Sequence, residues 1–358
     1  MSPQRTIILG VESSCDETAC AVVADGREVL SNAVATQIDL HRRFGGVVPE
    51  VASRAHIEAI GPVLDEALAA AGVAPDRIDA VAVTSQPGLV GSLVVGMMAA
   101  KTLAWAWGRP LIAVNHIHAH VYAPAVDDEP IVYPAVGLVI SGGHTALYGI
   151  RSPIDVDLLG QTIDDAAGEA FDKVASILRL GYPGGPAIER AARGGDPGAV
   201  RLPRTLLAAD SLDFSFSGLK TAVLYHVNGV PNAKLAPGAI AAKGPGYGKG
   251  ADGLSERETA DIAAGFQAVV ADVLAIKVRR AAQRVRPASI VVGGGVAANS
   301  AIRARLRAEA DKLGLPLRLP PMQYCTDNAA MIAAVAYHHL LAGQTAGLDL
   351  EATPTMRP

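Results

Sequence analysis

The chain opens with an apolar run, a polar turn and a second apolar run, TIILGVESSCDETACAVV (residues 6–23). Residues 6–11 and 19–23 have the length and composition of β-strands, so this stretch predicts a β-hairpin. The same arrangement returns in PAVGLVISGGHTALYGI (residues 134–150), where residues 141–145 are the turn. The two similar hairpins predict that the fold is duplicated.

Segments typical of helices alternate with short apolar segments after each hairpin. We expect strands at residues 78–84, 111–114 and 289–292, and helices at residues 57–71, 90–107, 167–180, 255–285, 297–313 and 328–341. Such alternation predicts parallel sheets joined by right-handed crossovers. The composition agrees, because 50% of the residues are hydrophobic but only 4% are aromatic, which gives the small aliphatic core of sheets covered by helices. The predicted fold class is α/β.

A length of 358 residues corresponds to two domains or so at about 150 residues each. We predict an N-terminal domain over residues 1–130, a C-terminal domain over residues 131–343 and a tail over residues 344–358. Residues 228–253 hold seven glycines and three prolines and predict a flexible surface loop within the second domain.

The formal net charge of −4 gives the chain no overall attraction to nucleic acid, so any RNA contact must be a local patch. Candidate patches are three clusters of basic residues: Lys277, Arg279, Arg280, Arg284 and Arg286; Arg303, Arg305 and Arg307; and Arg42, Arg43 and Arg54. Each could equally be a solvated helix face. Three cysteines without a C-x-x-C pair predict a reducing compartment, the cytoplasm. The apolar residues 89–100 are shorter than the roughly 20 that a membrane span needs, so we expect no membrane association.

The segment Asn115-His116-Ile117-His118-Ala119-His120 is the clearest indication of a metal site. If it is helical, with Asn115 near the N-cap, His116 and His120 lie on one face and could hold one ion. Asp327 is a candidate third ligand, with the alternative that it caps the helix after it. The histidines could also be packed or solvated side chains without a metal.

Several turns could bind an anionic or nucleotide ligand. The glycine turn at residues 141–145 could expose backbone N–H groups that hold phosphate oxygens, or it could be only a hairpin turn. The turn at residues 293–295, followed by Asn299, is placed where open α/β sheets bind nucleotides, or it could serve tight packing of helix on sheet. Asp172 and Glu189 could accept hydrogen bonds from ligand hydroxyls or belong to a solvated acidic face. Asp16 and Glu17 would repel a phosphate and suit a water, a metal or a proton transfer better.

Taken together, the motifs resemble the tRNA N6-adenosine threonylcarbamoyltransferase family (TsaD), within the actin, Hsp70 and sugar-kinase superfamily. The resemblance rests on residues 11–18, 115–120, 141–145, 164–173, 182–189, 214–221, 293–300 and 324–328. It implies two duplicated ribonuclease-H-like domains with a nucleotide cleft between them. It also implies transfer of the threonylcarbamoyl group from L-threonylcarbamoyl-adenylate to N6 of the adenosine 3′ of the anticodon in tRNAs that read codons starting with A, with release of AMP.

The resemblance also assigns roles to residues. His116, His120 and Asp327 would ligate an iron or zinc ion. The adenylate would be held by Val139, Ile140, Ser141, Gly142, Gly143, Asp172, Gly185, Glu189 and Asn299. The general base is left open, and we suggest Asp16 or Glu17. The expected partners are tRNA, the paralogous subunit TsaB and the small ATPase TsaE.

The sequence departs from the family at His118, between the two metal histidines, at Glu189, where an aspartate is expected, and in the longer loop at residues 228–253. Three rival functions fit the sequence less well. A metallopeptidase would need a glutamate where Ile117 stands. A kinase of the same superfamily would bind Mg²⁺ through carboxylates rather than imidazoles. A non-catalytic nucleotide-binding scaffold would be expected to lose the histidine pair.

Overall fold

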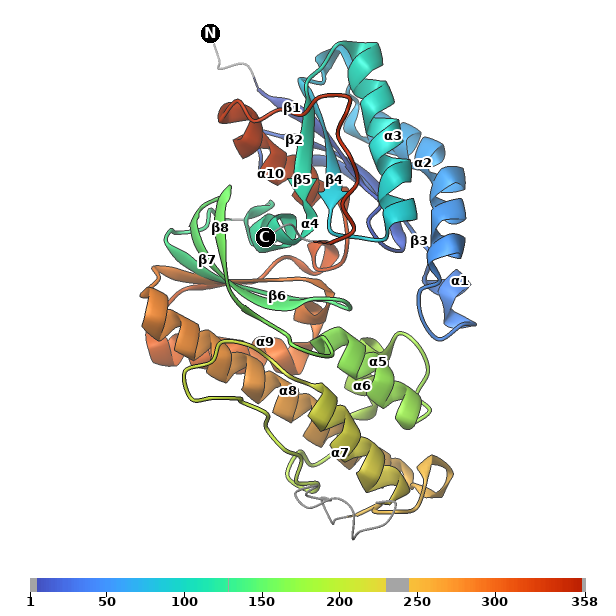
Figure 1. Ribbon diagram of the computed structural model, residues 1–358, viewed down its shortest axis with the longest axis vertical. Coiled ribbons are helices and arrows are strands. Elements are labelled where there is room, and N and C mark those ends of the chain that lie inside the picture. The colour runs from blue at the N-terminus through green and yellow to red at the C-terminus, as the bar shows by residue number, and fades with distance from the viewer. Residues whose placement is uncertain (1–4, 128, 230–244, 356–358) are drawn as a thin grey trace. The chain divides into compact units, whose positions relative to one another are not determined.

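The hairpin predicted at the start of the chain is formed by β1 (Ile7–Glu12) and β2 (Glu17–Ala24), which pair antiparallel. β3 (Glu28–Thr36) pairs antiparallel with β2, whereas β4 (Ala80–Gln86) and β5 (Leu111–Asn115) continue the sheet in parallel with β1. The strand order is β3-β2-β1-β4-β5 (Figure 1). The three parallel strands therefore end at one edge of this sheet.

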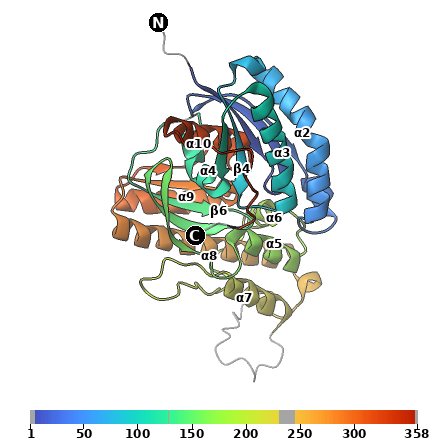
Figure 2. The same ribbon diagram turned by 45° about the horizontal axis from the view of Figure 1, so that its top comes forward.

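Helices cover both faces of the first sheet. α2 (Pro49–Ala71) and α3 (Val90–Trp107) lie side by side on one face, and α10 (Ala329–Leu341) packs on the other (Figures 1 and 2). Alternate residues of β1 face the two layers, so Leu9 and Val11 join the core under α2 and α3 while Gly10 faces α10. The short α1 (Ile38–Arg42), α4 (His116–Tyr122), η1 (Pro75–Arg77), η2 (Ala123–Ala125) and η5 (Met322–Tyr324) complete this part.

The second hairpin, β6 (Ala135–Ile140) with β7 (Thr145–Ser152), repeats the plan. β8 (Asp155–Gln161) lies beyond β7, and β9 (Ser289–Gly293) and β10 (Leu317–Arg318) lie on the other side, with β9 parallel to both β6 and β10. The order β10-β9-β6-β7-β8 is that of the first sheet read from its other edge. The predicted α/β class and the duplication are confirmed.

The second unit also contains α5 (Ala167–Ile177), α6 (Gly184–Ala191), α7 (Ser217–Asn228), α8 (Glu256–Val285) and α9 (Ser300–Leu313), with the turns η3 (Ala251–Gly253) and η4 (Gly295–Ala298). α8 and α9 pack on the sheet, and α6 and α7 pack on α5 and α8. α8 begins at a capping box in which the side chains of Ser255 and Glu258 bind each other's backbone N–H. Phe171 and Phe266 meet edge to face in the core, with ring centroids 5.0 Å apart. This core is largely aliphatic, as the composition predicts.

The computed structural model describes residues 5–127, 129–229 and 245–355, which divide into two units. Among these residues, the first unit takes in 5–127, 129–132, 151–156 and 320–355, and the second takes in 133–150, 157–229 and 245–319. This grouping differs from the sequence-based domain limits at residues 320–343, because α10 packs on β1, β2 and β4. The predicted tail also belongs to the first unit, where the Ala346 backbone N–H donates to Leu111.

The elements differ from the predicted ones in a few places. α2 begins at Pro49 rather than at residue 57, and β3, β8, β10, α6 and α7 were not predicted. The sheets are mixed rather than parallel, because each hairpin contributes antiparallel strands. Most of the predicted loop at residues 228–253 lies outside the described residues, and its described end returns along α7, where Gly248 and Gly250 donate to His226 and Val227.

Two helices among the described residues, α3 and α8, are long and apolar enough to cross a membrane by length and composition alone. The apolar run before Lys101, on which the expectation of no membrane span rests, is only part of α3, which continues to Trp107. Each of the two helices packs on the sheet of its own unit, and α8 is largely buried there.

We predict that Gly10→Ala destabilises the first unit. A Cβ at this position would lie 2.4 Å from the Ala329 carbonyl oxygen of α10, and backbone cannot move aside at small cost. The free energy of unfolding should fall by about 1–3 kcal/mol in urea denaturation. Gly61→Ala is the matched control, since nothing lies within 4 Å of its added Cβ on α2 and alanine favours a helix. A Gly10→Ala variant as stable as the wild type would contradict this packing.

Candidate metal centre

The parallel strands of the first unit bring polar side chains to one edge. Glu12 ends β1, and β5 ends at Asn115, where α4 begins at once. The Asn115 side chain accepts hydrogen bonds from the backbone N–H groups of Ile117 (2.8 Å) and His118 (3.2 Å) and so caps the helix. The segment is therefore helical, as predicted, with His116 and His120 on one face.

Asp327 lies against both histidines. Its Oδ1 is 3.0 Å from Nε2 of His120 and 3.5 Å from Nε2 of His116. The two imidazole rings meet edge to face with centroids 4.6 Å apart. The cap of α10 is not Asp327 but Asn328, whose side chain accepts from the Met331 backbone N–H. The alternative reading of Asp327 as a helix cap is therefore wrong.

The three side chains fit a metal ion. One ligand atom from each lies within 4.8 Å of the other two. Donors about 2.0–2.1 Å from a tetrahedral ion lie about 3.3 Å apart, close to the 3.0 and 3.5 Å observed. Imidazole nitrogen and carboxylate oxygen suit zinc and iron. Nδ1 of His120 is buried without a hydrogen-bond partner, so in the described structure the polar contacts of this ring are made by Nε2 alone.

The charged groups of this cluster shift one another's pKa values. Burial disfavours the charged form of each of these side chains, but nearby opposite charges outweigh the effect of burial for Asp327 and His116. The charge and hydrogen bonds of His116 hold the pKa of the Asp327 carboxyl well below its usual range, and Glu12 and Asp327 raise the pKa of His116. Burial and the neighbouring charge of His116 lower the pKa of His120. The site can therefore hold a positive charge between its carboxylates.

Three residues of this centre were not predicted from the sequence. Glu12 is fully buried, and its Oε2 lies 2.9 Å from Nδ1 of His116 and accepts from the Thr84 hydroxyl at 2.6 Å. The Ser14 hydroxyl lies 3.2 Å from the same nitrogen. The sequence pattern places Glu12 at the start of a polar turn, whereas in the structure it is the last residue of β1. The available signal was a charged residue, Glu12, placed directly after the apolar residues of β1.

Asp16 and Glu17, the suggested bases, lie in the turn after β1 and at the start of β2. Burial, followed by the charges of Asp327 and Asp16, raises the pKa of Glu17 to about 10. Its carboxyl is therefore protonated at neutral pH in the metal-free chain and can donate a proton but not accept one. Burial and the nearby carboxylates also raise the pKa of the Cys15 thiol, which favours the protonated thiol at neutral pH in the metal-free chain.

In the second unit, the two glycine turns lie together at the carboxyl ends of β6 and β9. Ser141 and His144 close the first turn through a backbone hydrogen bond of 2.8 Å, and a Cβ added to Gly142 or Gly143 would meet no other atom within 4 Å. Gly294 has a φ of +91°, and a Cβ there would lie 2.5 Å from the Ile140 carbonyl oxygen. The glycine thus allows the second turn to approach the end of β6.

The remaining predicted ligand residues also connect helices of the second unit. Asp172 accepts from the Gly184 backbone N–H at 2.7 Å, and Glu189 accepts from the Ser300 backbone N–H at 3.0 Å. Asn299 caps α9 and donates to Gln267 at 2.8 Å. A Cβ added to Gly185 would meet no other atom within 4 Å. Hydrogen bonds within the second unit thus hold Asp172, Glu189 and Asn299.

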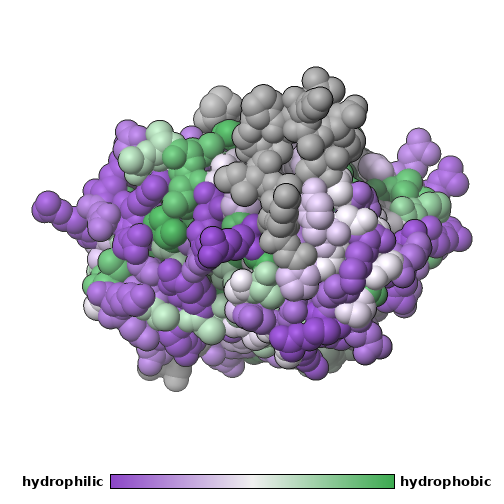
Figure 3. Space-filling view, turned by 90° about the horizontal axis from the view of Figure 1, so that it is seen from below, coloured by the Kyte–Doolittle hydropathy of each residue, from purple (hydrophilic) through white to green (hydrophobic). Residues whose placement is uncertain are grey.

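Several cations of the proposed RNA patches serve the fold instead. Lys277 is buried and donates to the carbonyls of Leu206 and Ser211, Arg280 donates to the same loop, and Arg279 pairs with the buried Glu309 at 3.1 Å. Charge reversal at Arg279 and Arg280 would therefore destabilise the second unit, so its effect could not be assigned to tRNA binding alone. Figure 3 shows a face that is mainly hydrophilic, with smaller hydrophobic areas between the polar side chains.

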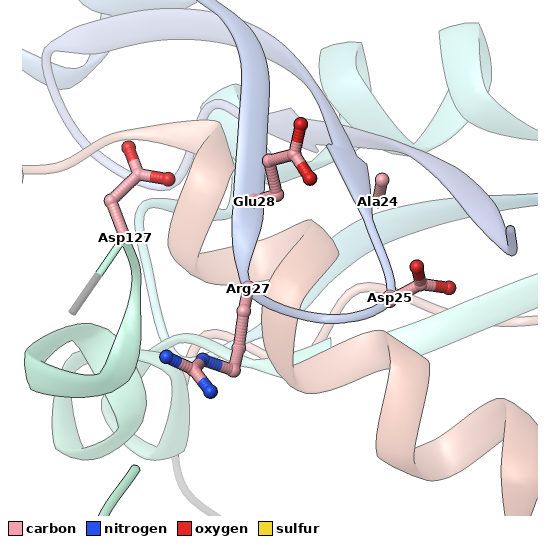
Figure 4. Close-up of a pocket in the computed structure, with 5 residues that line it drawn as sticks. All are labelled: Ala24, Asp25, Arg27, Glu28 and Asp127. Atoms are coloured by element: carbon pink, nitrogen blue, oxygen red, sulfur yellow. The ribbon is translucent and has the colours of Figure 1, made fainter. Parts of the chain in front are cut away.

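A separate pocket of about 490 Å³ in the first unit is lined by Ala24, Asp25, Arg27, Glu28 and Asp127 (Figure 4). Two of its carboxylates already accept hydrogen bonds from other groups of the protein. Asp127 accepts from the Val29 backbone N–H and from the Tyr324 hydroxyl, and Asp25 accepts from the Thr6 backbone N–H. None of the predicted site residues lines this pocket.

Most of the chain matches a known protein family. A family model described as TsaD, tRNA N6-adenosine threonylcarbamoyltransferase, matches residues 28–334. The chain belongs to this family. Relatives of that name from Anaeromyxobacter dehalogenans strain 2CP-1 and Thermomicrobium roseum are each 52% identical to it, and the alignments cover 98% and 96% of this chain and 99% and 95% of the relatives. The chain is therefore a transferase of tRNA modification.

Solved structures of low sequence identity share the fold. HypF from T. kodakarensis aligns with a TM-score of 0.59 at 14% identity, over 97% of this chain and 49% of its own. Component A of the (R)-2-hydroxyglutaryl-CoA dehydratase of Acidaminococcus fermentans aligns with a TM-score of 0.52 at 16% identity, over 94% and 99%. These likenesses support the two-domain ribonuclease-H-like fold that the family resemblance implies.

We predict that Glu17 makes the metal-free protein less stable as pH rises. The unfolded chain loses the Glu17 proton near the ordinary pKa of 4.5, whereas the folded chain keeps it until about 10. Between these values the folded state binds more protons, so stability falls with increasing pH. Glu17→Gln should therefore gain stability relative to the wild type from about pH 5 to pH 9 in urea unfolding with a chelator present. Glu66→Gln, an exposed glutamate of α2, is the control, and equal pH profiles for wild type and Glu17→Gln would refute the assignment.

Proposed function

We propose that the chain transfers the threonylcarbamoyl group of L-threonylcarbamoyl-adenylate to N6 of the adenosine 3′ of the anticodon in tRNAs that read codons starting with A. In this reaction the N6 nitrogen bonds to the carbamoyl carbon, the bond from that carbon to the phosphate oxygen breaks, and AMP leaves. The observation that carries the proposal is the buried cluster of His116, His120 and Asp327 in a chain of this family.

We propose that His116, His120 and Asp327 hold one iron or zinc ion. When bound, such an ion is a Lewis acid that polarises a carbonyl group. The chain supplies the charge balance through Asp327 and the buried Glu12, and it keeps both imidazoles out of bulk water. Burial strengthens each of these electrostatic interactions.

The amine of the acceptor must lose a proton as it reacts, and two acids stand in the turn after β1. Glu17 is protonated at neutral pH in the metal-free chain and hydrogen-bonds with Asp16. A protonated carboxyl cannot accept the amine proton, so of the two suggested bases we propose Asp16 as the acceptor and Glu17 as the group that orients it.

In the second unit we propose that the adenylate contacts Val139, Ile140, Ser141, Gly142, Gly143, Asp172, Gly185, Glu189 and Asn299. Backbone N–H groups in the open glycine turn suit phosphate oxygens. The carboxylates of Asp172 and Glu189, already oriented by Gly184 and Ser300, suit ribose hydroxyls. Donors fixed before the reaction stabilise charge that develops on the leaving phosphate.

We also propose that the chain works in the cytoplasm with tRNA as its macromolecular substrate, with a paralogous TsaB subunit and with the small ATPase TsaE. The three cysteines, which are free thiols, support a reducing compartment.

The test combines metal analysis with the transfer assay. We expect the double variant His116→Ala and His120→Ala to lose its metal and to lower the rate of threonylcarbamoyl transfer to tRNA by about 100-fold or more, because two of the three ligands are gone. His118→Ala, on the same helix but outside the cluster, is the matched control and should keep both. Retention of metal and transfer by the double variant would overturn the proposed function.

A further inference from the structure

Glu12 is a carboxylate with no contact to water. Its side chain is fully buried at the end of β1, where an ionised group is costly unless hydrogen bonds replace its hydration. Three donors meet it: the Ser14 backbone N–H on Oε1 at 2.5 Å, the Thr84 hydroxyl on Oε2 at 2.6 Å and Nδ1 of His116 on Oε2 at 2.9 Å. The donors come from the turn after β1, from β4 and from α4.

In the hydrogen bond between Glu12 and His116, the donor and the acceptor can be assigned. An ionised carboxylate only accepts hydrogen bonds, so the proton of this contact must sit on Nδ1 of the ring. The ring nitrogen on the other side, Nε2, is the one that faces Asp327, at 3.5 Å. Since Glu12 contacts Nδ1 and not the Nε2 side, it is placed to orient the histidine rather than to join the cluster of three ligand atoms.

We propose that Glu12, braced by Thr84 and by the Ser14 backbone, is a positioning residue that fixes the tautomer and ring orientation of His116, so that Nε2 is presented to the metal. This inference rests on the proposed metal site of His116, His120 and Asp327. A carboxylate behind a ligating histidine also raises the basicity of that ligand, and loss of such a partner commonly costs about 10- to 100-fold in metal affinity.

The hydrogen bonds from Thr84 and Ser14 to Glu12 decide how firmly the His116 ring is held. The Thr84 hydroxyl shares Oε2 with His116 and keeps that oxygen in line with the ring. The Ser14 backbone N–H holds the other oxygen, so the carboxylate cannot rotate without losing a bond. An amide at position 12 has nearly the same shape but only one acceptor atom, and its NH₂ group would oppose one of these donors.

The experiment measures metal binding by the full-length protein after chelation, with Zn²⁺ in competition and with Co²⁺, whose visible absorption reports coordination. We expect Glu12→Gln to weaken Zn²⁺ binding by about 10- to 100-fold and to change the Co²⁺ spectrum. Thr84→Val removes one brace without touching the ring and should weaken binding in the same direction by a smaller factor.

Ser13→Ala is the matched control. Its hydroxyl is also buried in this turn, but it bonds to Ser92 and Gly96 rather than to the histidine, so metal affinity should stay at the wild-type value. Wild-type affinity and spectrum in both Glu12→Gln and Thr84→Val, while His116→Ala loses the metal, would overturn the positioning role and leave the metal site intact. Metal binding that survives His116→Ala would instead overturn the site itself. If Glu12→Gln does not fold, Thr84→Val decides.

Discussion

The candidate metal site of the first unit depends on Asp327 reaching two buried histidines. Buried ionisable groups destabilise a fold unless they pair or bind an ion, and here Nε2 of His120 and Oδ1 of Asp327 lie 3.0 Å apart. Asp327 precedes α10, so this helix must pack on β1 for the contact to form. Gly10 permits that approach, because a larger residue would meet the backbone of α10. A residue near the end of the chain thus completes a site built on its first strands.

The duplicated topology explains how one plan supports two kinds of chemistry. In both units the hairpin strands are joined by parallel strands that end at the same edge, the position at which open α/β sheets bind ligands. The first unit places imidazoles and carboxylates at that edge. The second places glycines and helix caps there, including Gly294 at positive φ against β6. The strand order is shared, and the residues at the strand ends give each unit its own chemistry.

Hydropathy patterns predicted both hairpins, α3 at its observed limits and the helix that carries His116 and His120, because these depend on local sequence. β3 was missed, since it alternates between buried and exposed residues at a sheet edge and carries polar side chains. Hydropathy patterns do not show which residues far apart in the sequence are in contact. Helical spacing cannot show that Arg279 binds Glu309 of α9, or that Glu12 lies behind His116 rather than in a turn. The metal ligands came from the family resemblance together with the spacing of the histidines.

The central claim is that both imidazoles and the Asp327 carboxylate bind one ion. X-ray absorption spectroscopy of the zinc-loaded protein tests it most directly, since scattering from imidazole rings is distinct from that of water or carboxylate oxygen. The account predicts first-shell nitrogen and oxygen at about 2.0–2.2 Å, with the outer-shell signature of two histidines. A shell of oxygen alone, or histidine scattering that persists unchanged after both ring ligands are replaced, would contradict it.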